Sequence, residues 1–232
     1  MLIDHSQTYK GISLRNLPHR LRLRTILSML DKRSLSGDMR FADFGCSNGY
    51  ITNIIAKRYG IKNASGFDYE EDHMVAARER YPEIAFDTIN LNTAKGTENF
   101  DLVTCFETLE HVGDVENALS HLLSSTRKGG LLFVSVPIEI GFRGLVKFMA
   151  KSIIYRFRYQ SDLDELVGDK IGLKYFLALL FNKDISRFRE KRQRWGTHYG
   201  FDYRVVDSFF RKRQVSISVI NRFTSRFYLI KV

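Results

Sequence analysis

The chain has 232 residues and a formal net charge of +10, from 36 Lys and Arg against 26 Asp and Glu. Hydrophobic residues make up 44% and aromatic residues 13%, which excludes a disordered or fibrous protein and is typical of one globular domain with an insertion. The positive charge favours an anionic partner, and it is concentrated in residues 139–197, where 13 Lys or Arg against 7 Asp or Glu give a net charge of +6.

The first predicted element is an amphipathic helix over residues 17–30. Leucines and Ile26 recur there at helical spacing, and we interpret Arg20, Arg22 and Arg24 between them as a solvated basic face. From about residue 40 to 137, apolar runs of strand length alternate with amphipathic stretches of helix length, which indicates a parallel sheet covered by helices. Strands are predicted at 40–44, 64–68, 84–88, 101–105 and 131–136, and helices at 50–59, 71–81 and 115–127, the last with a glycine stop at 128–130. Beyond the insertion, a helix at 203–210 and strands at 214–220 and 225–232 complete the chain.

The stretch FADFGCSNGY, residues 41–50, joins an apolar strand, a glycine turn and a helix start, the usual crevice for a nucleotide in an open α/β sheet. A dinucleotide loop has a second glycine where this loop has Ser47, so a close pyrophosphate is disfavoured. Asp43 would repel a pyrophosphate, but its carboxylate can accept hydrogen bonds from a ligand's ammonium group or from the loop's own amides. Asp68 ends the second strand, where a carboxylate can bind both hydroxyls of a ribose. An amine together with a ribose predicts S-adenosylmethionine (SAM).

Five motifs in this order resemble those of the class I SAM-dependent methyltransferases, namely ADFGCSNG, GFDY, INLN, FDLVTCFETLEHV and KGGLLFVSVP. The resemblance covers residues 40–137 well and 198–232 more loosely. It implies an α/β fold: a mostly parallel seven-stranded sheet with helices on both faces, the last strand antiparallel, and a helical lid insertion. It also implies the cofactor-binding residues, which are Asp43, Gly45, Cys46 and Gly49 at the methionine part, Asp68 at the ribose, Tyr69, Asn90 and Leu91 at the adenine, and Phe106 beneath the ligand. Ser47 departs from the family glycine, and Asn90 stands where an acid is common, although its amide can still bind adenine.

The segment FETLEHV, after the fourth predicted strand, is similar to that of many small-molecule O-methyltransferases, especially the enzymes of ubiquinone biosynthesis. We take His111 as the candidate general base for a hydroxyl acceptor, because imidazole titrates near neutral pH, and Glu110 as the group that orients it. The alternative is that His111 only braces the turn. The Asn/Asp-Pro-Pro-aromatic motif of enzymes that methylate base amines is absent.

A second interpretation of this segment is a divalent metal site. Glu107, Glu110 and His111 are spaced i, i+3, i+4 and can project from one side of a helical turn, with His198 as a fourth ligand. A similar pattern occurs in small-RNA 2′-O-methyltransferases, so metal-assisted methylation of RNA is an alternative function. The E-H-V sequence also recurs in methyltransferases that use no metal, which favours SAM as the sole cofactor. A non-catalytic SAM-binding protein is the alternative from another class.

We assign residues 1–138 and 198–232 to the SAM-binding core and residues 139–197 to a basic, aromatic helical insertion. Residues 141–159 predict a basic amphipathic helix, which can lie on an anionic membrane or cover an acidic substrate. Residues 171–181 are more apolar and are expected to pack on the domain, and residues 184–196 offer Phe188 and Trp195 for stacking. A lid over a small-molecule acceptor, peripheral membrane contact and RNA binding stay open as roles.

The sequence also bears on the compartment. No stretch approaches the roughly 18 uncharged apolar residues of a spanning helix, and the first residues lack the pattern of a signal peptide. The cysteines are Cys46 and Cys105 alone, too few for a disulfide framework and without zinc-ligand spacing. We therefore expect a cytoplasmic protein with reduced thiols.

Overall fold

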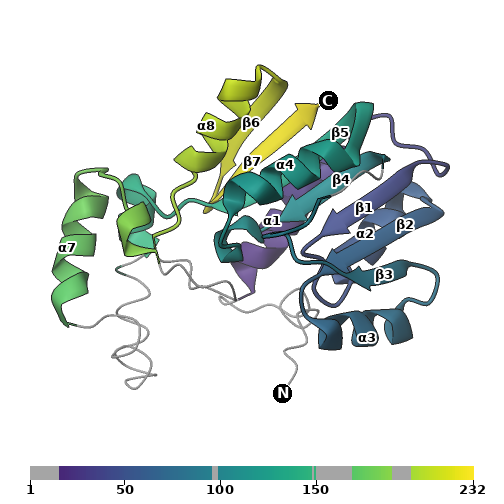
Figure 1. The fold of residues 1–232 in the computed structure, drawn as a ribbon, viewed down its shortest axis with the longest axis horizontal. Helices are drawn as coiled ribbons and strands as arrows, with labels where there is room; N and C mark the ends of the chain where they lie inside the picture. Colours follow the sequence, from purple (N-terminus) through teal and green to yellow (C-terminus); the bar gives the residue numbers. More distant parts are fainter. Residues whose placement is uncertain (1–15, 96–98, 148, 150–168, 190–199) are drawn as a thin grey trace.

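The computed structural model describes residues 16–95, 99–147, 149, 169–189 and 200–232. Within them, seven strands form one sheet in the order β3-β2-β1-β4-β5-β7-β6 (Figure 1). The strands are β1 (Arg40–Phe44), β2 (Asn63–Asp68), β3 (Ala85–Thr88), β4 (Phe100–Phe106), β5 (Thr126–Pro137), β6 (Ser216–Arg222) and β7 (Ser225–Lys231). The pairs among β1 to β5 are parallel, and β7 is antiparallel to both neighbours, β5 and β6. The predicted fold class is confirmed.

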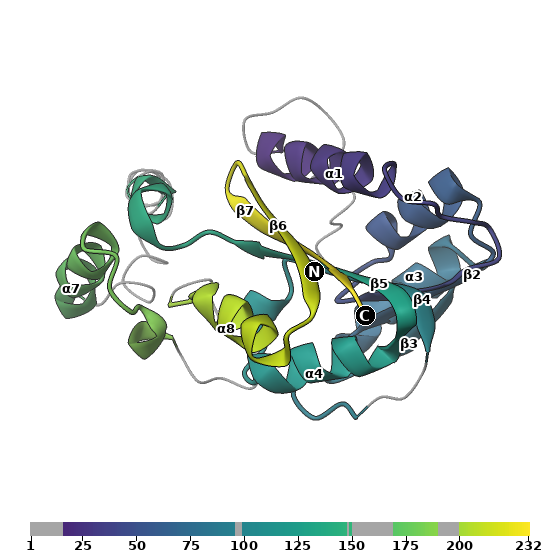
Figure 2. The same cartoon turned by 90° about the horizontal axis from the view of Figure 1, so that it is seen from above.

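Helices cover both faces of the sheet (Figure 2). One face carries α1 (Leu17–Leu30), α2 (Tyr50–Tyr59) and α3 (Glu71–Arg80), and the other carries α4 (Val115–Ser125) and α8 (Arg204–Arg213). Each face has its own buried apolar cluster, one joining Ile26, Ile55 and Met74 to Phe41, Leu102 and Phe133, the other joining Leu119, Leu122 and Phe209 to Val103, Val134 and Tyr228. A sheet buried on both faces explains why its central strands are apolar at almost every position.

The helix α4 is the element whose predicted end was wrong. The glycine stop suggested that it runs to Arg127, but the helix ends at Ser125 and β5 begins at Thr126. Thr126 pairs with Phe100 of β4, and Arg127 forms an ion pair with Asp101, so strand pairing overrides the helical pattern at these residues. For the same reason β5 begins five residues before its predicted start at residue 131. The other elements begin and end within about three residues of their predicted bounds.

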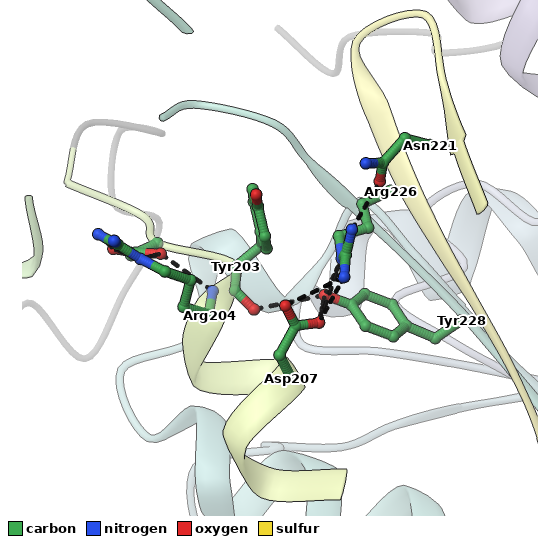
Figure 3. A network of polar contacts seen from close by, with 7 residues as sticks. Tyr203, Arg204, Asp207, Asn221, Arg226 and Tyr228 are labelled. Carbon is green, nitrogen blue, oxygen red and sulfur yellow. Dashed lines mark hydrogen bonds and ion pairs between the residues drawn. The ribbon is translucent and has the colours of Figure 1, made fainter. Parts of the chain in front are cut away.

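A polar network fixes α8 against the terminal strand pair (Figure 3). The carboxylate of Asp207 on α8 accepts hydrogen bonds from Arg226 (Nη2–Oδ1 3.0 Å) and from the hydroxyl of Tyr228 (2.9 Å). Arg226 also donates to Oδ1 of Asn221 at 2.9 Å, and its guanidinium lies 4.7 Å from the ring centroid of Tyr203. Arg226 is the register partner of Val136, near the carboxyl end of β5. The network therefore fixes α8 to the β6–β7 pair at this edge of the sheet.

The described part of the insertion has an apolar cluster of its own, formed by Ile140, Leu145, Tyr175, Ala178, Leu179 and Ile185. Residues 141–147 are helical, and α7 (Asp169–Leu180) stands to one side of the sheet (Figure 1). We expected residues 171–181 to pack on the domain. Instead, α7 packs on this separate cluster, and Leu173, Leu177 and Leu180 on its outer side are exposed. None of the helices described is long and apolar enough to span a bilayer. The predicted helix beyond residue 149 and Trp195 lie outside the described residues.

His121, on α4, is a buried side chain in an apolar setting. Neither of its ring nitrogens has a hydrogen-bond partner in the described part of the chain, and its ring meets that of Phe44 edge-on at 5.1 Å. Burial lowers the pKa of its imidazole below the usual 6.5.

Replacement of His121 should therefore change how stability depends on pH. Above pH 6.5 the ring is neutral in the folded and the unfolded chain, whereas below 6.5 the unfolded chain takes up a proton that the buried ring resists. Relative to the wild type, His121→Leu should gain about 1 kcal/mol of unfolding free energy between about pH 7.5 and pH 5.5. Urea unfolding at the two pH values measures the difference. If the difference in unfolding free energy between the two proteins is the same at both pH values, the lowered pKa of His121 is contradicted.

Candidate functional site

A cavity of about 540 Å³ lies at the carboxyl ends of β1, β2 and β4. This volume lies within the range of about 300–1,000 Å³ that is usual for ligand pockets. Strands β1 and β4 are neighbours in the sheet, and the order of the strands reverses between them, since β2 and β3 follow on one side and β5 on the other. Open α/β sheets bind their ligands at such a reversal. The cavity brings together most of the predicted site residues: Asp43, Gly45, Cys46, Asp68, Tyr69, Asn90, Leu91, Phe106, Glu110 and His111. Gly49 is not among its lining residues.

The loop after β1 depends on unusual backbone conformations. Gly45 has φ +75°, and a Cβ atom there would lie 2.1 Å from Oγ1 of Thr108, so only glycine allows this loop to contact the turn after β4. Gly49 has φ 73° and caps the start of α2 rather than facing the cavity. Ser47, where the family pattern has glycine, also has a positive φ, 49°. Its N–H donates to Oδ2 of Asp68 at 2.8 Å, which holds the loop in this conformation.

Asp43 lies beneath the loop and joins three elements. It is 2% exposed, and its two carboxylate oxygens accept hydrogen bonds from the hydroxyls of Thr104 on β4 (2.6 Å) and Thr52 on α2 (2.7 Å). Burial raises the pKa of Asp43 to about 6, against the effect of the two hydrogen bonds. The sequence had suggested a ligand ammonium group or loop amides as partners, and no sequence signal marked the two threonines.

Asp68, at the end of β2, has an electrostatic environment different from that of Asp43. Burial alone would raise the pKa of its carboxyl, but His73 and the N–H groups of Ser47 and Glu70 lower it by more, so the pKa is below its usual value. The Nδ1 atom of His73 lies 3.9 Å from Oδ1 of Asp68, and the N–H of Glu70 lies 3.2 Å from the same oxygen. The carboxylate is therefore ionised at neutral pH, as the binding of ribose hydroxyls requires. Cys46 and Cys105 are free, buried thiols whose pKa burial raises.

The post-β4 turn, residues 107–112, forms the opposite wall of the cavity. It contains Glu107, with φ +51°, and the short helix η2 (Leu109–His111). Glu107 accepts a hydrogen bond from Ser135 at 3.0 Å and pairs with Arg22 at 2.9 Å. Glu110 is 1% exposed, and burial, followed by repulsion from Glu107, raises the pKa of its carboxyl well above its usual value. Two carboxyl groups of the same turn thus have different environments, one in an ion pair and one buried.

Three basic side chains of the site were not predicted from the sequence. Arg22 was interpreted as part of a solvated face, which is correct for Arg20 and Arg24 but wrong for Arg22, whose side chain is 14% exposed and also donates to Ser225 at 3.2 Å. Lys147, from the insertion, lines the cavity and pairs with Glu139. The third is Arg189, whose guanidinium binds carbonyl oxygens of the post-β4 turn. The partners of Arg22 and Arg189 lie 77 or more residues away in the chain, which leaves no local pattern that would reveal them.

In the ranges that the structure describes, no three His, Cys, Asp or Glu side chains are grouped so that they could hold a metal ion. The carboxylate of Glu107 is engaged by Arg22 and Ser135. His198, the fourth ligand of the metal hypothesis, lies outside the described residues. The four-residue metal site stays a hypothesis.

Comparison with known proteins identifies the family. A family model described as a methyltransferase domain matches residues 14–160, more than half of the chain. The chain belongs to the class I SAM-dependent methyltransferases. This confirms the resemblance carried by the five motifs.

Relatives of this chain differ in the activities that their names state. A trans-aconitate 2-methyltransferase of Rhizobium etli is 31% identical over 120 residues, which cover 52% of this chain and 47% of the relative. A ubiquinone biosynthesis O-methyltransferase of Hydrogenovibrio crunogenus is 31% identical over 166 residues, 63% of this chain and 68% of the relative. The chain thus spans about half the length of the first of these relatives.

A solved structure confirms the fold of the methyltransferase over nearly its whole length. The magnesium protoporphyrin IX methyltransferase of Synechocystis, with bound S-adenosylhomocysteine (SAH), superimposes with a TM-score of 0.62 at 15% identity, covering 98% of this chain and 92% of the other. At this level of identity the likeness concerns the fold alone.

The positive φ of Ser47 leads to a test of backbone strain. A residue with a side chain in the left-handed region carries about 1–2 kcal/mol of backbone strain. Glycine removes this strain, but it loses more conformational freedom on folding, which offsets part of the gain. Ser47→Gly should therefore raise the unfolding free energy, by up to about 1 kcal/mol. The control Ser124→Gly, on an exposed position of α4, should lower it by about 1 kcal/mol. Denaturant unfolding of both variants measures this, and a loss of stability in Ser47→Gly would show that the position is unstrained.

Proposed function

We propose that this methyltransferase transfers the methyl group of SAM to a hydroxyl group of a small molecule. The observation that carries the proposal is the single cavity in which the ribose-type carboxylate Asp68 and the candidate base His111 both form part of the lining. SAM, when bound, supplies a methyl group on a sulfonium. The tasks left to the protein are to hold the acceptor in line with that group and to remove its proton.

The cofactor half of the cavity suits SAM residue by residue. Asp68 would bind the ribose hydroxyls, Asn90 and Leu91 the adenine edge with Tyr69 beside it, and Phe106 would lie beneath the ligand. Asp43, Gly45 and Cys46 would line the methionine part, with Gly49 shaping the start of α2. Ser47 would add a contact, since its hydroxyl is buried and has no hydrogen-bond partner among the described residues.

The acceptor half would use the post-β4 turn. His111 would take the proton of the acceptor hydroxyl, and Glu110 would orient its ring. Burial raises the pKa of the Glu110 carboxyl, which favours the protonated form, and a protonated carboxyl can donate a hydrogen bond to the ring. Arg22 neutralises Glu107 on the same wall, so the negative charge that develops on the acceptor oxygen would not face an unpaired carboxylate.

A carboxylate acceptor is the second candidate, and the trans-aconitate 2-methyltransferase among the relatives favours it. A carboxylate is already ionised at neutral pH and needs no general base. The two candidates therefore differ in what they require of His111.

Substitution of His111 separates the two. For a hydroxyl acceptor, His111→Gln should lower the rate of methyl transfer about 10²- to 10⁴-fold. The cavity wall that would hold the cofactor is unchanged, so the affinity for SAH should stay within about twofold. The assay follows labelled methyl from SAM into a metabolite extract, and calorimetry with SAH gives the affinity. An unchanged rate would point to the carboxylate acceptor, and a wild type that does not bind SAH would contradict the proposed function altogether.

We also propose that the outer side of α7 makes peripheral contact with an anionic membrane. Leu173 and Leu177 of α7, together with Phe181 directly after it, are 67%, 41% and 64% exposed at helical spacing. Lys174 and Lys183 are exposed near them. Apolar side chains with basic neighbours are typical of helices that lie on lipid headgroups. Contact with a membrane would bring the site close to an acceptor that is linked to a lipid.

Co-sedimentation with vesicles tests the membrane contact. The wild type should bind vesicles that contain phosphatidylserine in moderate salt and bind phosphatidylcholine vesicles less, and Leu177→Glu should abolish binding by placing a charge in the contact. The matched control is Ile220→Glu, an equally exposed apolar position on β6 at 40% exposure. Equal binding by both variants, or none by the wild type, would contradict the contact and leave a solvated lid or an RNA-binding segment.

A further inference from the structure

One half-buried arginine, Arg189, joins the insertion to the post-β4 turn. We infer that Arg189 is a positioning residue, which fixes the main chain of this turn and thereby the orientation of His111. The inference rests on the proposed function, because it assigns the insertion a part in the acceptor half of that site. It gives the insertion a role that a cover over the substrate would not have.

The contacts of Arg189 are with main-chain carbonyl groups. Its Nη2 atom lies 3.3 Å from the carbonyl oxygens of both Leu109 and Glu110 and within hydrogen-bond distance of that of Val112. The last carbonyl groups of a helix lack partners within the helix, and a cation at that end satisfies them and offsets their partial negative charge. Arg189 thus acts as a C-terminal cap for η2, supplied from 77 to 80 residues away in the sequence.

The position of Arg189 itself is closely determined. It directly follows the short helix η3 (Ser186–Phe188), whose preceding residue, Ile185, is fully buried in the insertion's apolar cluster. Its guanidinium lies 5.1 Å from the ring centroid of the buried Phe201. Gly200 has φ +73°, and a Cβ atom there would lie 2.4 Å from the main-chain nitrogen of Arg189. The chain returning to the core therefore packs directly against Arg189.

The post-β4 turn is also fixed by buried side chains and by its own main chain, since Leu109 and Val112 pack in the core cluster of this face of the sheet. Its own main-chain bonds run from the N–H of His111 to Thr108 (2.9 Å) and from the N–H of Val112 to Leu109 (3.3 Å). At its start, the left-handed Glu107 is held by Arg22 of α1. The turn is thus held at its two ends by arginines from two segments outside the sheet, and His111 lies at the end that Arg189 holds.

Three variants of the full chain test this role. Arg189→Ala removes all donors, and Arg189→Lys keeps the charge but not the planar fork of donors. Arg187→Ala is the matched control, because Arg187 is exposed and its guanidinium lies 4.8 Å from the ring centroid of Phe188 rather than on the turn. The first readout is amide hydrogen exchange. The amides of His111 and Val112 should exchange about tenfold faster in Arg189→Ala, less so in Arg189→Lys, and at the wild-type rate in Arg187→Ala.

The second readout is methyl transfer from labelled SAM into a metabolite extract. The maximal rate should fall about tenfold in Arg189→Ala, with partial recovery in Arg189→Lys and an unchanged half-saturating SAM concentration, because the cofactor half does not contact Arg189. Unchanged exchange and rate in Arg189→Ala, or an equal loss in Arg187→Ala, would overturn the inference. If Arg189→Ala fails to fold, Arg189→Lys decides by the same two readouts. If the wild type neither binds SAH nor transfers methyl groups, the proposed function fails, and exchange alone still decides whether Arg189 holds the turn.

Discussion

The close contact between Gly45 and Thr108 is the constraint on which the site depends. Strands β1 and β4 are neighbours, so the loops that follow them must pass each other at the same edge of the sheet. They do so at a distance that leaves no room for a single Cβ atom on Gly45. Two residues before Gly45, the carboxylate of Asp43 on β1 accepts hydrogen bonds from hydroxyls of β4 and α2. These bonds fix β1 to β4 and to the helix that follows β1. The two loops that line the cavity are thus held together where Gly45 meets Thr108.

Four carboxyl groups line this one cavity, and the fold treats each in a different way. Asp43 is buried with two hydroxyl donors and titrates near pH 6. Asp68 is kept ionised by His73 and two main-chain N–H groups, and Glu107 is paired with Arg22. Burial raises the pKa of Glu110 well above its usual value. Separate environments thus give carboxyl groups so close together different pKa shifts and different partners within one cavity.

The sequence predicted the features that depend on local pattern. The apolar strands, the glycine turn and the acids at the strand ends follow from alternation and from the geometry of parallel sheets, and so Asp43 and Asp68 were found at once. The pairing of Arg22 with Glu107 and the cap from Arg189 were not found, because each joins segments about 80 residues apart and residues such as Arg20 and Arg22 look alike in a helical pattern. The end of α4 was missed since pairing of Thr126 with Phe100 is a tertiary effect. The missing glycine at Ser47 was noticed, but its positive φ, which keeps the glycine conformation, needed the structure.

The two halves of the cavity are therefore built by different means. The cofactor half uses short motifs within the core, and the family model covers them all between residues 14 and 160. The acceptor half takes Arg22 from α1, Lys147 and Arg189 from the insertion, and Thr224 from the β6–β7 turn, and two of these four lie beyond the family match. Relatives with different acceptors can share the first half without sharing the second. If the proposed division of the cavity holds, the acceptor is selected by long-range contacts, among them those of Arg189 with the post-β4 turn.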